Sequence, residues 1–390
     1  MEYRQLGRSG LRVSLHTLGT MTFGGEGFFA MAGKTALDEA RRIIDVAVDH
    51  GVNMIDTSNI YSVGRSEEIV GAALKDKSQQ ILVGTKVRFS MGQGPNEGGL
   101  SRYHIIEQCE ASLKRLQRDR IDLYFLHEWD GQTPVEEMME ALDTLVKQGK
   151  VRYIGCSNFS GWHIMKALMA ADRHNWQRFC CQQIHYTIEA REAEHELMPI
   201  AIDQGVGIQV WSPIAGGLLS GKFRRNAPPP QISRHTAGWG EPPIADEDRL
   251  YRITDALVAV GEARGVSAAQ VALAWLAGRP GVASIIVGAR TEAQLKDNLA
   301  AAGLELTPEE RKRLERRKLE ALVGYCETTR CRHQALLAVF GEEHPGACGA
   351  CDNCLNPPQV WDGTTAAQKA LSAIIRTGQR FGVVHLIKIL

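Results

Sequence analysis

The chain has 390 residues, of which 44% are hydrophobic and 23% are charged, a composition typical of a soluble globular protein. Lys+Arg and Asp+Glu are equal at 45 each, so the net charge gives no argument for binding to nucleic acid or to a membrane. Residues 1–5 lack the apolar core of a signal peptide and no apolar run reaches the length of a membrane span, so we expect a cytoplasmic protein.

The chain begins with two short segments, Tyr3–Leu6 and Leu11–Ser14, on either side of a Gly-Arg-Ser-Gly turn. This spacing predicts a β-hairpin that could close the bottom of a barrel. The Gly-Lys-Thr sequence that ends at Thr35 is not a phosphate-binding P-loop, because the first glycine of that motif falls on Phe28. We expect Thr35 to cap the helix that follows it.

From about residue 15 to residue 303, short apolar runs rich in β-branched residues alternate with amphipathic helical segments. The predicted strands are His16–Gly19, Val52–Asp56, Ile81–Thr85, Ile121–Leu126, Val151–Cys156, Cys180–Ile184, Gly207–Trp211 and Ser284–Val287. The predicted helices include Ala36–His50, Glu67–Lys75, His104–Leu116, Val135–Lys147 and Trp162–Ala171. This α/β alternation predicts a closed (β/α)₈ TIM barrel. An open doubly wound sheet is the rival, but no Gly-x-Gly-x-x-Gly follows the first strand.

The stretch Phe223–Asp246 has no helix or strand periodicity and contains two proline runs. A loop of this length in a compact domain is usually functional, so we expect a lid or a strap over a cofactor.

Four titratable residues follow three neighbouring predicted strands. Asp56 ends the second strand, Tyr61 lies five residues further on, Lys86 follows the third strand and His127 the fourth. Active sites of such barrels lie at the carboxyl ends of the strands, so these side chains should converge. They suit carbonyl reduction: Tyr61 could protonate the oxygen, Lys86 could lower the pKa of Tyr61, Asp56 could hold Lys86, and His127 could orient the carbonyl. Each residue alone has an ordinary structural explanation, but four together favour catalysis.

Several motifs resemble the aldo-keto reductase family in order and spacing. They are VNMIDTSNIY at 52–61, GRSEE at 64–68, GTK at 84–86, DLYFLH at 122–127 and GKVRYIGCSNF at 149–159. The resemblance covers about residues 1–312 and implies an NADP(H)-dependent reductase of aldehydes or ketones, with Tyr61 as general acid, Lys86 and Asp56 tuning it, and His127 orienting the substrate.

The same resemblance implies a set of cofactor-binding residues. Ser157, Asn158 and Gln183 would hold the nicotinamide carboxamide, and Trp211 would stack on the nicotinamide ring. Arg290, at the start of a helix, suits a 2′-phosphate and favours NADPH over NADH. The other cofactor residues implied are Thr20, Met21, Asp56, Ser212, Pro213, Gly217, Leu218, Ser220, Lys222, Gly288, Gln294 and Asn298.

Three aromatic residues in loops after the strands, Phe23, Phe89 and Trp129, are the candidates for the substrate pocket. They suggest an apolar or aromatic small-molecule carbonyl compound as the partner of the barrel. The sequence carries no signal of oligomeric state.

The character of the chain changes near residue 308, where Thr307–Glu310 has the pattern of a capped helix start. Residues 311–390 contain 12 Lys/Arg against 7 Asp/Glu, a charge of +5, whereas residues 1–310 contain 33 against 38, a charge of −5. We therefore predict a barrel over 1–312, a small helical zinc-binding module over 316–362 and an incomplete winged-helix fragment over 363–390.

Four cysteines of the last module, Cys331, Cys348, Cys351 and Cys354, have the spacing C-x16-C-x2-C-x2-C. In a reducing compartment such a cluster is typical of a closed tetrahedral Zn²⁺ site. Free thiols, an iron–sulfur cluster and Cys326 as a competing ligand are the alternatives.

Residues 331–342 and 348–354 resemble the zinc-binding element of RecQ-type DNA helicases, and residues 362–369 and 376–382 resemble the start of the winged helix that follows it in that family. The resemblance covers about residues 316–390, and the helicase motor has no counterpart here. Three functions follow as hypotheses: a carbonyl reductase with a structural tail, a DNA-associated protein tethered by its basic tail, and an NADPH-binding regulatory subunit with slow turnover. The four catalytic candidates favour the first, and the modest charge of +5 disfavours nucleic acid as a partner.

Overall fold

The computed structural model divides the chain into two compact units, Met1–Leu314 and Glu315–Leu390. It describes residues 1–77, 80–225, 228, 230, 233–240, 244, 246–315, 324–339, 342, 344–359, 364, 365, 368, 369 and 372.

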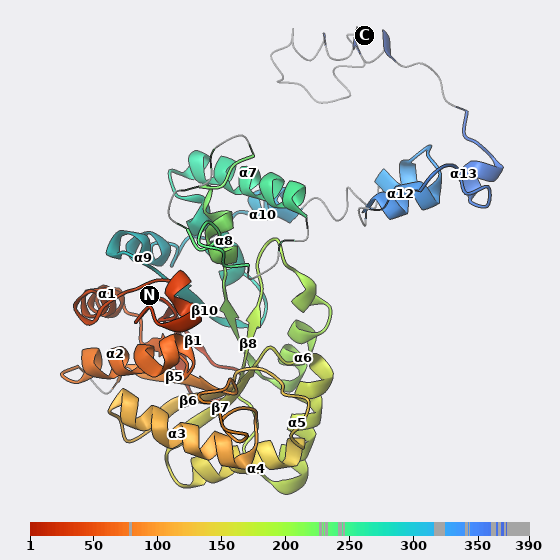
Figure 1. Cartoon of the computed structure of the whole chain (residues 1–390). Helices are drawn as coiled ribbons and strands as arrows, with labels where there is room; N and C mark the ends of the chain where they lie inside the picture. The colour runs from red at the N-terminus through yellow and green to blue at the C-terminus, as the bar shows by residue number, and fades with distance from the viewer. Residues whose placement is uncertain are drawn as a thin grey trace. The chain divides into compact units, whose positions relative to one another are not determined.

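The first unit is a closed barrel of eight parallel strands (Figure 1). Around the barrel they run in the order β10-β3-β4-β5-β6-β7-β8-β9. Their bounds are β3 His16–Gly19, β4 Met54–Asp56, β5 Leu82–Val87, β6 Ile121–Leu126, β7 Val151–Ser157, β8 Cys181–His185, β9 Gly207–Trp211 and β10 Val282–Gly288. Pairing of Val287 in β10 with Leu18 in β3 closes the ring. The predicted (β/α)₈ barrel is therefore confirmed.

Helices lie around the outside of the strands (Figure 1). They are α1 Leu37–Asp49, α2 Arg65–Leu74, α3 Arg102–Leu116, α4 Val135–Lys147, α5 Gly161–His174, α6 Leu197–Gln204, α7 Glu247–Arg264, α8 Ala268–Ala277, α9 Glu292–Leu299 and α10 Pro308–Glu315. Short 3₁₀ turns are η1 Gly27–Met31, η2 Tyr61–Gly64, η3 Glu192–Glu194 and η4 Ala215–Ser220. In α1, Ala40, Ile43, Ile44 and Ala47 are buried at helical spacing, which places one apolar face against the barrel.

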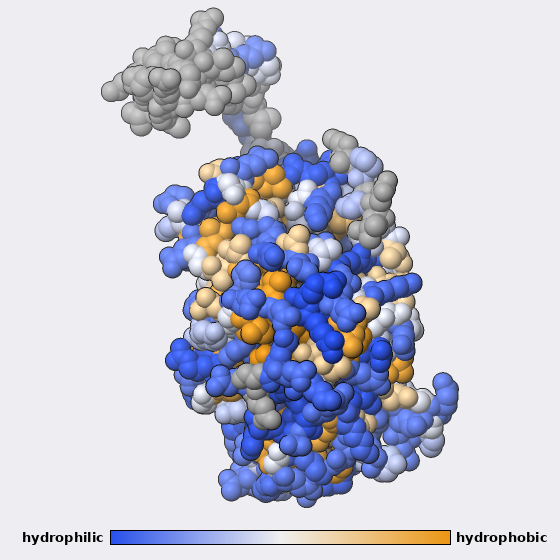
Figure 2. Space-filling view, turned by 90° about the vertical axis from the view of Figure 1, so that its left-hand side faces the viewer, coloured by the Kyte–Doolittle hydropathy of each residue, from blue (hydrophilic) through white to orange (hydrophobic). Residues whose placement is uncertain are grey.

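One face of the molecule is shown in Figure 2, where hydrophilic residues predominate and hydrophobic residues form small scattered patches. No single helix in the described part of the chain is both long enough and apolar enough to cross a membrane. Helices α7 and α8 meet that criterion only when counted together, and they are bent by 99° at their junction.

The predicted hairpin is present as β1 Tyr3–Gln5 and β2 Arg12–Ser14, paired antiparallel. Beside these strands, Leu6 is fully buried in a cluster with Phe125 and other residues of the barrel interior. The Arg4 guanidinium donates hydrogen bonds of 2.8 Å to the carbonyl oxygens of Ala277 and Val282. The hairpin therefore packs against the amino-terminal ends of the strands, opposite the end at which barrel active sites lie.

Thr35 does not cap α1 as the sequence suggested. The N-cap position is Ala36, which makes no side-chain capping bond. The backbone of Thr35 instead pairs with the segment around Phe23: its N–H donates to Thr22 O, and its carbonyl accepts from Gly24 N–H, both at 3.0 Å. This bridge fixes the loop between β3 and α1 and directs Phe23 into the core, where it is fully buried.

His16, the first residue of β3, is fully buried, and neither ring nitrogen has a hydrogen-bond partner among the described residues. Burial, with smaller contributions from Arg4 and the amino terminus, lowers the pKa of His16 to about 4. The imidazole is therefore neutral inside the folded barrel at neutral pH, whereas the unfolded chain takes up a proton on it below about pH 6.5.

This difference predicts a loss of stability on acidification. Because the unfolded state binds more protons than the folded state between pH 6.5 and about 4, the free energy of unfolding falls as the pH is lowered through that window. Urea unfolding followed by circular dichroism at pH 7 and pH 4.5 should show that His16 accounts for about 2–3 kcal/mol of the decrease. His16→Leu should remove this part, and replacement of the exposed His195 by leucine should not. Equal pH dependence in wild type and His16→Leu would contradict the prediction.

The second unit contains helices α12 Arg332–Val339 and α13 Asp352–Leu355. Of the predicted winged-helix fragment 363–390, only residues 364, 365, 368, 369 and 372 are described, so that prediction lies outside the described residues.

Candidate active site and metal centre

A cavity of about 1070 Å³ opens at the carboxyl ends of the barrel strands. Strand ends from around the barrel line it, among them Gly19, Asp56, Ser157, Gln183, Trp211 and Gly288. Substrate and cofactor sites of such barrels are found at this end.

Lys86 lies below the cavity floor and is fully buried. Its ammonium donates to Asp56 Oδ2 at 2.5 Å and to the carbonyl oxygen of Thr57 at 2.8 Å. The Tyr61 hydroxyl lies 3.5 Å from the same Nζ. Because β4 and β5 are adjacent parallel strands, their last residues meet at one edge and bring these groups together. The structure thus unites three of the four residues predicted for catalysis.

The protonation states of Lys86 and Tyr61 depend on their burial and on their contacts with each other and with Asp56. Burial alone would lower the pKa of Lys86, but Asp56 and Tyr61 carry it above its usual value, so Lys86 stays protonated. The pKa of Tyr61 is raised, because burial outweighs the opposing effect of Lys86. The sequence suggested a net lowering of this pKa. The direction is opposite because burial of the phenol, to which the Phe29 ring contributes, raises its pKa more than Lys86 lowers it, and Asp56 raises it further.

His127 completes the predicted group on the other side of Tyr61. The two rings meet edge to face with centroids 5.9 Å apart, and the Phe89 ring lies 5.0 Å from the imidazole. Burial, together with Lys86 and Arg88, lowers the pKa of His127 well below its usual value, so the ring is neutral at pH 7. Its Nδ1 shares a 3.1 Å hydrogen bond with the Ser58 hydroxyl. With that hydroxyl as the donor, Nε2 carries the proton and can donate to a ligand.

Trp211, at the end of β9, forms a flat apolar wall of the cavity. Its indole N–H donates to Asn158 Oδ1 at 3.1 Å, and Asn158 Nδ2 donates to the carbonyl oxygen of His127 at 3.1 Å. The His185 ring packs against the indole of Trp211, with the two ring centroids 4.7 Å apart. This contact and these bonds fix the indole in one orientation.

Two polar groups near Trp211 are suited to an amide ligand. The Ser157 hydroxyl is buried and has no hydrogen-bond partner among the described residues, although Ser157 lines the cavity. Gln183 donates from Nε2 to Asp56 Oδ1 at 2.9 Å. Its amide oxygen does not take part in that bond and can accept a further one. A carboxamide beside Trp211 would satisfy both groups, so these residues fit a nicotinamide.

Two arginines line the cavity and lie close enough to interact with each other. Arg290 donates from its guanidinium to the carbonyl oxygens of Ala32 (3.1 Å) and Met31 (3.3 Å). Arg234 comes from the long loop predicted as a strap, and burial together with Arg290 lowers its pKa to about 10. Neither side chain forms an ion pair with a described carboxylate. Two cations without a counterion in a cavity fit a phosphate group. Arg234 was not among the residues predicted from the sequence, because the loop around it has no periodicity from which to infer the direction of its side chains.

Most of the predicted cofactor residues line the cavity: Thr20, Met21, Asp56, Ser157, Asn158, Gln183, Trp211, Ser212, Pro213, Gly217, Ser220, Lys222, Gly288, Arg290, Gln294 and Asn298. Leu218 does not; it is buried in the core.

Of the three predicted pocket residues, the structure brings only Phe89 to the cavity. Phe23 is fully buried in the hydrophobic core, and Trp129 stacks on His163 with ring centroids 4.0 Å apart. Phe28 and Phe29 of η1 and Trp239 of the long loop line the cavity in addition to Phe89, and they contact one another.

Several residues around the cavity have the left-handed backbone conformation, which residues other than glycine rarely adopt. Ser62 and Val63 follow Tyr61 with φ of 49° and 55°, Asn158 has φ of 56°, and Ser212 and Ala215 follow Trp211 with φ of 51° and 49°. Each such residue costs about 1–2 kcal/mol. Hydrogen bonds from Gly25 N–H to Ser62 Oγ and from Gly216 N–H to Ser212 Oγ, both 3.0 Å, help to hold the two turns.

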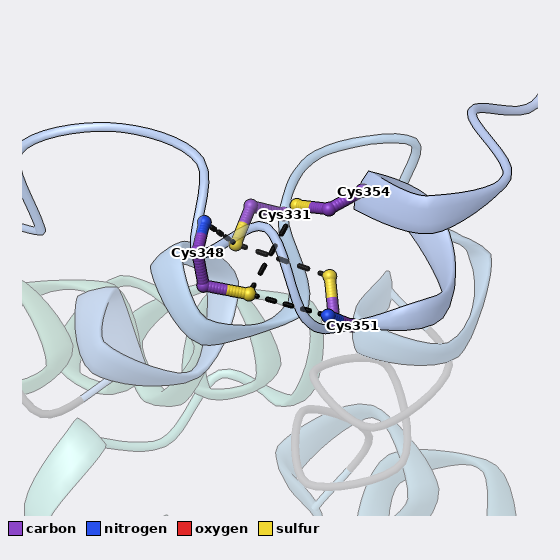
Figure 3. Close-up of side chains that lie close together, drawn as sticks. All are labelled: Cys331, Cys348, Cys351 and Cys354. Carbon is purple, nitrogen blue, oxygen red and sulfur yellow. Dashed lines mark hydrogen bonds between the residues drawn. The ribbon is translucent and has the colours of Figure 1, made fainter.

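The four predicted metal ligands of the second unit converge (Figure 3). All four sulfur atoms lie within 4.8 Å of one another. Cys348 and Cys354 are 3.9 Å apart, and Cys331 and Cys351 are 4.0 Å apart. A tetrahedron with Zn–S bonds of 2.3 Å has S–S edges of about 3.8 Å. The thiols therefore fit a zinc ion. Cys326 lies outside this group.

Backbone N–H groups surround the sulfur atoms. Cys348 N–H donates to Cys331 Sγ, Cys351 N–H to Cys348 Sγ and Arg332 N–H to Cys351 Sγ, each at 3.3 Å. Backbone hydrogen bonds from Gln334 and Cys348 lower the pKa of Cys331 to about 6. Such donors stabilise the thiolates that bind a metal.

Side chains tie the two halves of this centre together. Arg332, next to Cys331, pairs with Asp352, next to Cys351, through Nε and Nη2 at 2.9 Å. Asn353 Nδ2 donates to the carbonyl oxygens of Thr328 at 2.6 Å and Arg330 at 2.9 Å. These bonds hold the first ligand close to the last three.

Three family models match the chain. Aldo/keto reductase family matches residues 17–318, RecQ zinc-binding matches residues 292–355, and RQC domain matches residues 357–390.

Curated relatives match more than three quarters of this chain. An uncharacterized oxidoreductase, YrpG, of Bacillus subtilis is 39% identical over 321 residues, which are 79% of this chain and 93% of the relative. A probable voltage-gated potassium channel subunit beta of Arabidopsis thaliana is 36% identical over 308 residues, 77% of this chain and 91% of the relative. The protein of the same description from Oryza sativa subsp. japonica is 36% identical over 319 residues, 79% of this chain and 94% of the relative.

Proposed function

This chain belongs to the aldo/keto reductase family, and we propose that it reduces aldehydes or ketones to alcohols by hydride transfer from NADPH. Family and relatives support a general oxidoreductase role. The observation that carries the finer proposal is the buried Lys86, 2.5 Å from Asp56 and 3.5 Å from the Tyr61 hydroxyl, below a cavity lined by Asp56, Tyr61, Trp211 and Arg290.

Bound NADPH would supply the hydride. Ser157 and Gln183 would hold its carboxamide, Trp211 would pack on the nicotinamide, and Arg290 with Arg234 would hold phosphate. The cavity volume of about 1070 Å³ exceeds that of most sites for a single small ligand.

The chain's own residues would handle the carbonyl oxygen. His127 Nε2–H donates a hydrogen bond that orients the carbonyl and stabilises the negative charge that develops on oxygen. The Tyr61 hydroxyl donates its proton to that oxygen. The phenolate left behind is stabilised by Lys86, whose own proton stays on because Asp56 pairs with it. The raised pKa of Tyr61 keeps the phenol protonated until negative charge develops on the carbonyl oxygen of the substrate.

The direct test is NADPH oxidation, followed by absorbance, with a panel of aldehydes, ketones and α-dicarbonyls. Repeated turnover with a member of the panel supports the proposal, and its failure with every member would refute it. The aromatic rings of Phe28, Phe29, Phe89 and Trp239 favour apolar or aromatic members.

Arg290→Ala is expected to weaken the binding of NADPH much more than that of NADH, because only NADPH carries the 2′-phosphate. A charge-assisted hydrogen bond contributes about 1.5–3 kcal/mol, so the dissociation constant for NADPH should rise about 10- to 100-fold. Titration of both cofactors by tryptophan fluorescence measures this. Lys222→Ala is the matched control: Lys222 also lines the cavity and would contact the pyrophosphate, which both cofactors share. An equal loss for both cofactors in Arg290→Ala would show that Arg290 does not read the 2′-phosphate.

We also propose that Cys331, Cys348, Cys351 and Cys354 hold one structural Zn²⁺. When bound, the ion would cross-link α12 to α13 and offer no open position for chemistry. The RecQ zinc-binding and RQC matches raise nucleic-acid binding as an alternative role for the second unit. Salt-dependent retention of the protein on DNA would reveal it.

A second candidate function for the barrel is regulation, because two relatives at 36% identity are described as channel β subunits. A regulatory subunit would bind NADPH tightly and release the oxidised cofactor slowly. A fast single turnover followed by a much slower steady state would favour this candidate over a metabolic reductase.

A further inference from the structure

In the barrel interior, one buried amide lies beside an apolar cluster. Gln209, in β9, is fully buried. Around it, Leu6, Leu123, Phe125 and Cys181 form an apolar cluster inside the strands. Burying an amide costs about 1–3 kcal/mol unless its hydrogen bonds are replaced, and a methionine would fill the same space without this cost. Packing alone therefore does not explain an amide at this position, and we look for its function in the site.

Gln209 contacts the floor of the site through Gln183. The two are direct neighbours in the register of β8 and β9, and Gln183 Nε2 lies 3.4 Å from Gln209 Oε1. Gln209 Nε2 donates to Met54 Sδ at 3.3 Å. Because Met54 Sδ accepts the hydrogen bond from Gln209 Nε2, the amide oxygen of Gln209 stays turned towards Gln183.

The amide nitrogen of Gln183 therefore has two acceptors, Asp56 Oδ1 at 2.9 Å and Gln209 Oε1 at 3.4 Å. Both act on the same –NH₂ group, which fixes the rotation of the amide. Only the oxygen of Gln183 remains for a ligand in the cavity that this residue lines. Gln183 thus presents an acceptor, and not a donor, to the cavity.

We propose that Gln209 is a positioning residue: it orients Gln183 so that the cavity presents an acceptor for the N–H of the nicotinamide carboxamide. The inference rests on the proposed use of NADPH. It assigns no chemistry to Gln209, which touches neither the cavity nor the reacting atoms.

The test compares NADPH with its 3-acetylpyridine analogue, in which a methyl ketone replaces the carboxamide and leaves no N–H to donate. Dissociation constants of both are measured by tryptophan fluorescence in wild type and in Gln209→Met. Wild type should prefer NADPH, and Gln209→Met should reduce that preference about fivefold, the effect of one neutral hydrogen bond. Misfolding or general loosening would weaken both cofactors alike and leave the ratio unchanged.

Gln182→Met is the matched control. Gln182 precedes Gln183 in β8 and also carries a buried amide, but its Nε2 donates to Leu197 O at 2.8 Å, and among the described residues its side chain makes no hydrogen bond with the Gln183 side chain. Its replacement should leave the ratio as in wild type. Met54→Leu, which removes the sulfur acceptor of Gln209, should lower the ratio in the same direction and serves if Gln209→Met does not fold.

An unchanged ratio in a Gln209→Met variant that has the circular dichroism spectrum of wild type and binds NADPH, or in such a Met54→Leu variant where only that one folds, would overturn the inference alone. Failure of the wild type to bind NADPH would overturn it together with the proposed function. Binding with the expected ratios but no carbonyl reduction would refute only the reductase activity.

Discussion

Tyr61→Phe is expected to lower kcat by about 10²–10⁴, the usual contribution of a general acid, while the dissociation constant for NADPH stays near that of wild type. The variant removes a single oxygen, 3.5 Å from Lys86 Nζ, and keeps the ring that packs against Phe29 and His127. Only proton donation is lost, because none of the proposed cofactor contacts uses this hydroxyl.

Steady-state NADPH oxidation and fluorescence titration of the cofactor measure the two quantities. Tyr124→Phe is a matched control: that tyrosine is fully buried, and its hydroxyl donates to the carbonyl oxygen of Ile105 at 3.2 Å, within the core and away from the cavity. It should affect stability and leave kcat unchanged. Turnover of Tyr61→Phe within a few-fold of wild type would mean that another group supplies the proton.

Removal of zinc is expected to unfold the module around the four cysteines while the barrel continues to turn over. Structural zinc contributes about 10–16 kcal/mol in small domains of this kind, more than such a short segment can gain from its own core. Elemental analysis should find one zinc per chain, and limited proteolysis after chelation should cut within 316–362. Cys351→Ser should abolish zinc binding, whereas Cys326→Ala should not, because Cys326 lies outside the sulfur cluster.

The same prediction extends to deletion of residues 316–390. Every residue proposed for catalysis or cofactor binding lies between Thr20 and Asn298, within the first compact unit. Reductase activity of the shortened chain should therefore match that of the full chain. Loss of activity from a 1–315 chain with an intact circular dichroism spectrum would show that the second unit contributes to the site.

The sequence was sufficient for the barrel because parallel strands buried on both faces appear as short apolar runs separated by amphipathic helices. The bounds of β3, β6 and β9 agree with the prediction to the residue. The proximity of Asp56, Lys86 and Tyr61 could also be predicted from the sequence, because consecutive strands of such a barrel all end at the same face.

Directions of side chains in loops could not be inferred in this way. Phe23 turns into the core because its loop pairs with Thr35, and Trp129 turns away from the cavity to stack on His163. Arg234 reaches the cavity from a loop without periodicity. The net direction of the Tyr61 pKa depends on how much apolar surface surrounds the phenol, which only the folded structure provides.

The left-handed residues that follow Tyr61 and Trp211 have a consequence for attempts to engineer this protein. Sequence optimisation that rewards local backbone preference would replace Val63 and Ala215 by glycine and count each change as a gain. Such changes would loosen the turns that hold the Tyr61 phenol and the Trp211 indole. The melting temperature would then rise while kcat falls. Stabilising substitutions are better sought at the opposite end of the barrel, around the hairpin, where no proposed catalytic or cofactor contact depends on the backbone.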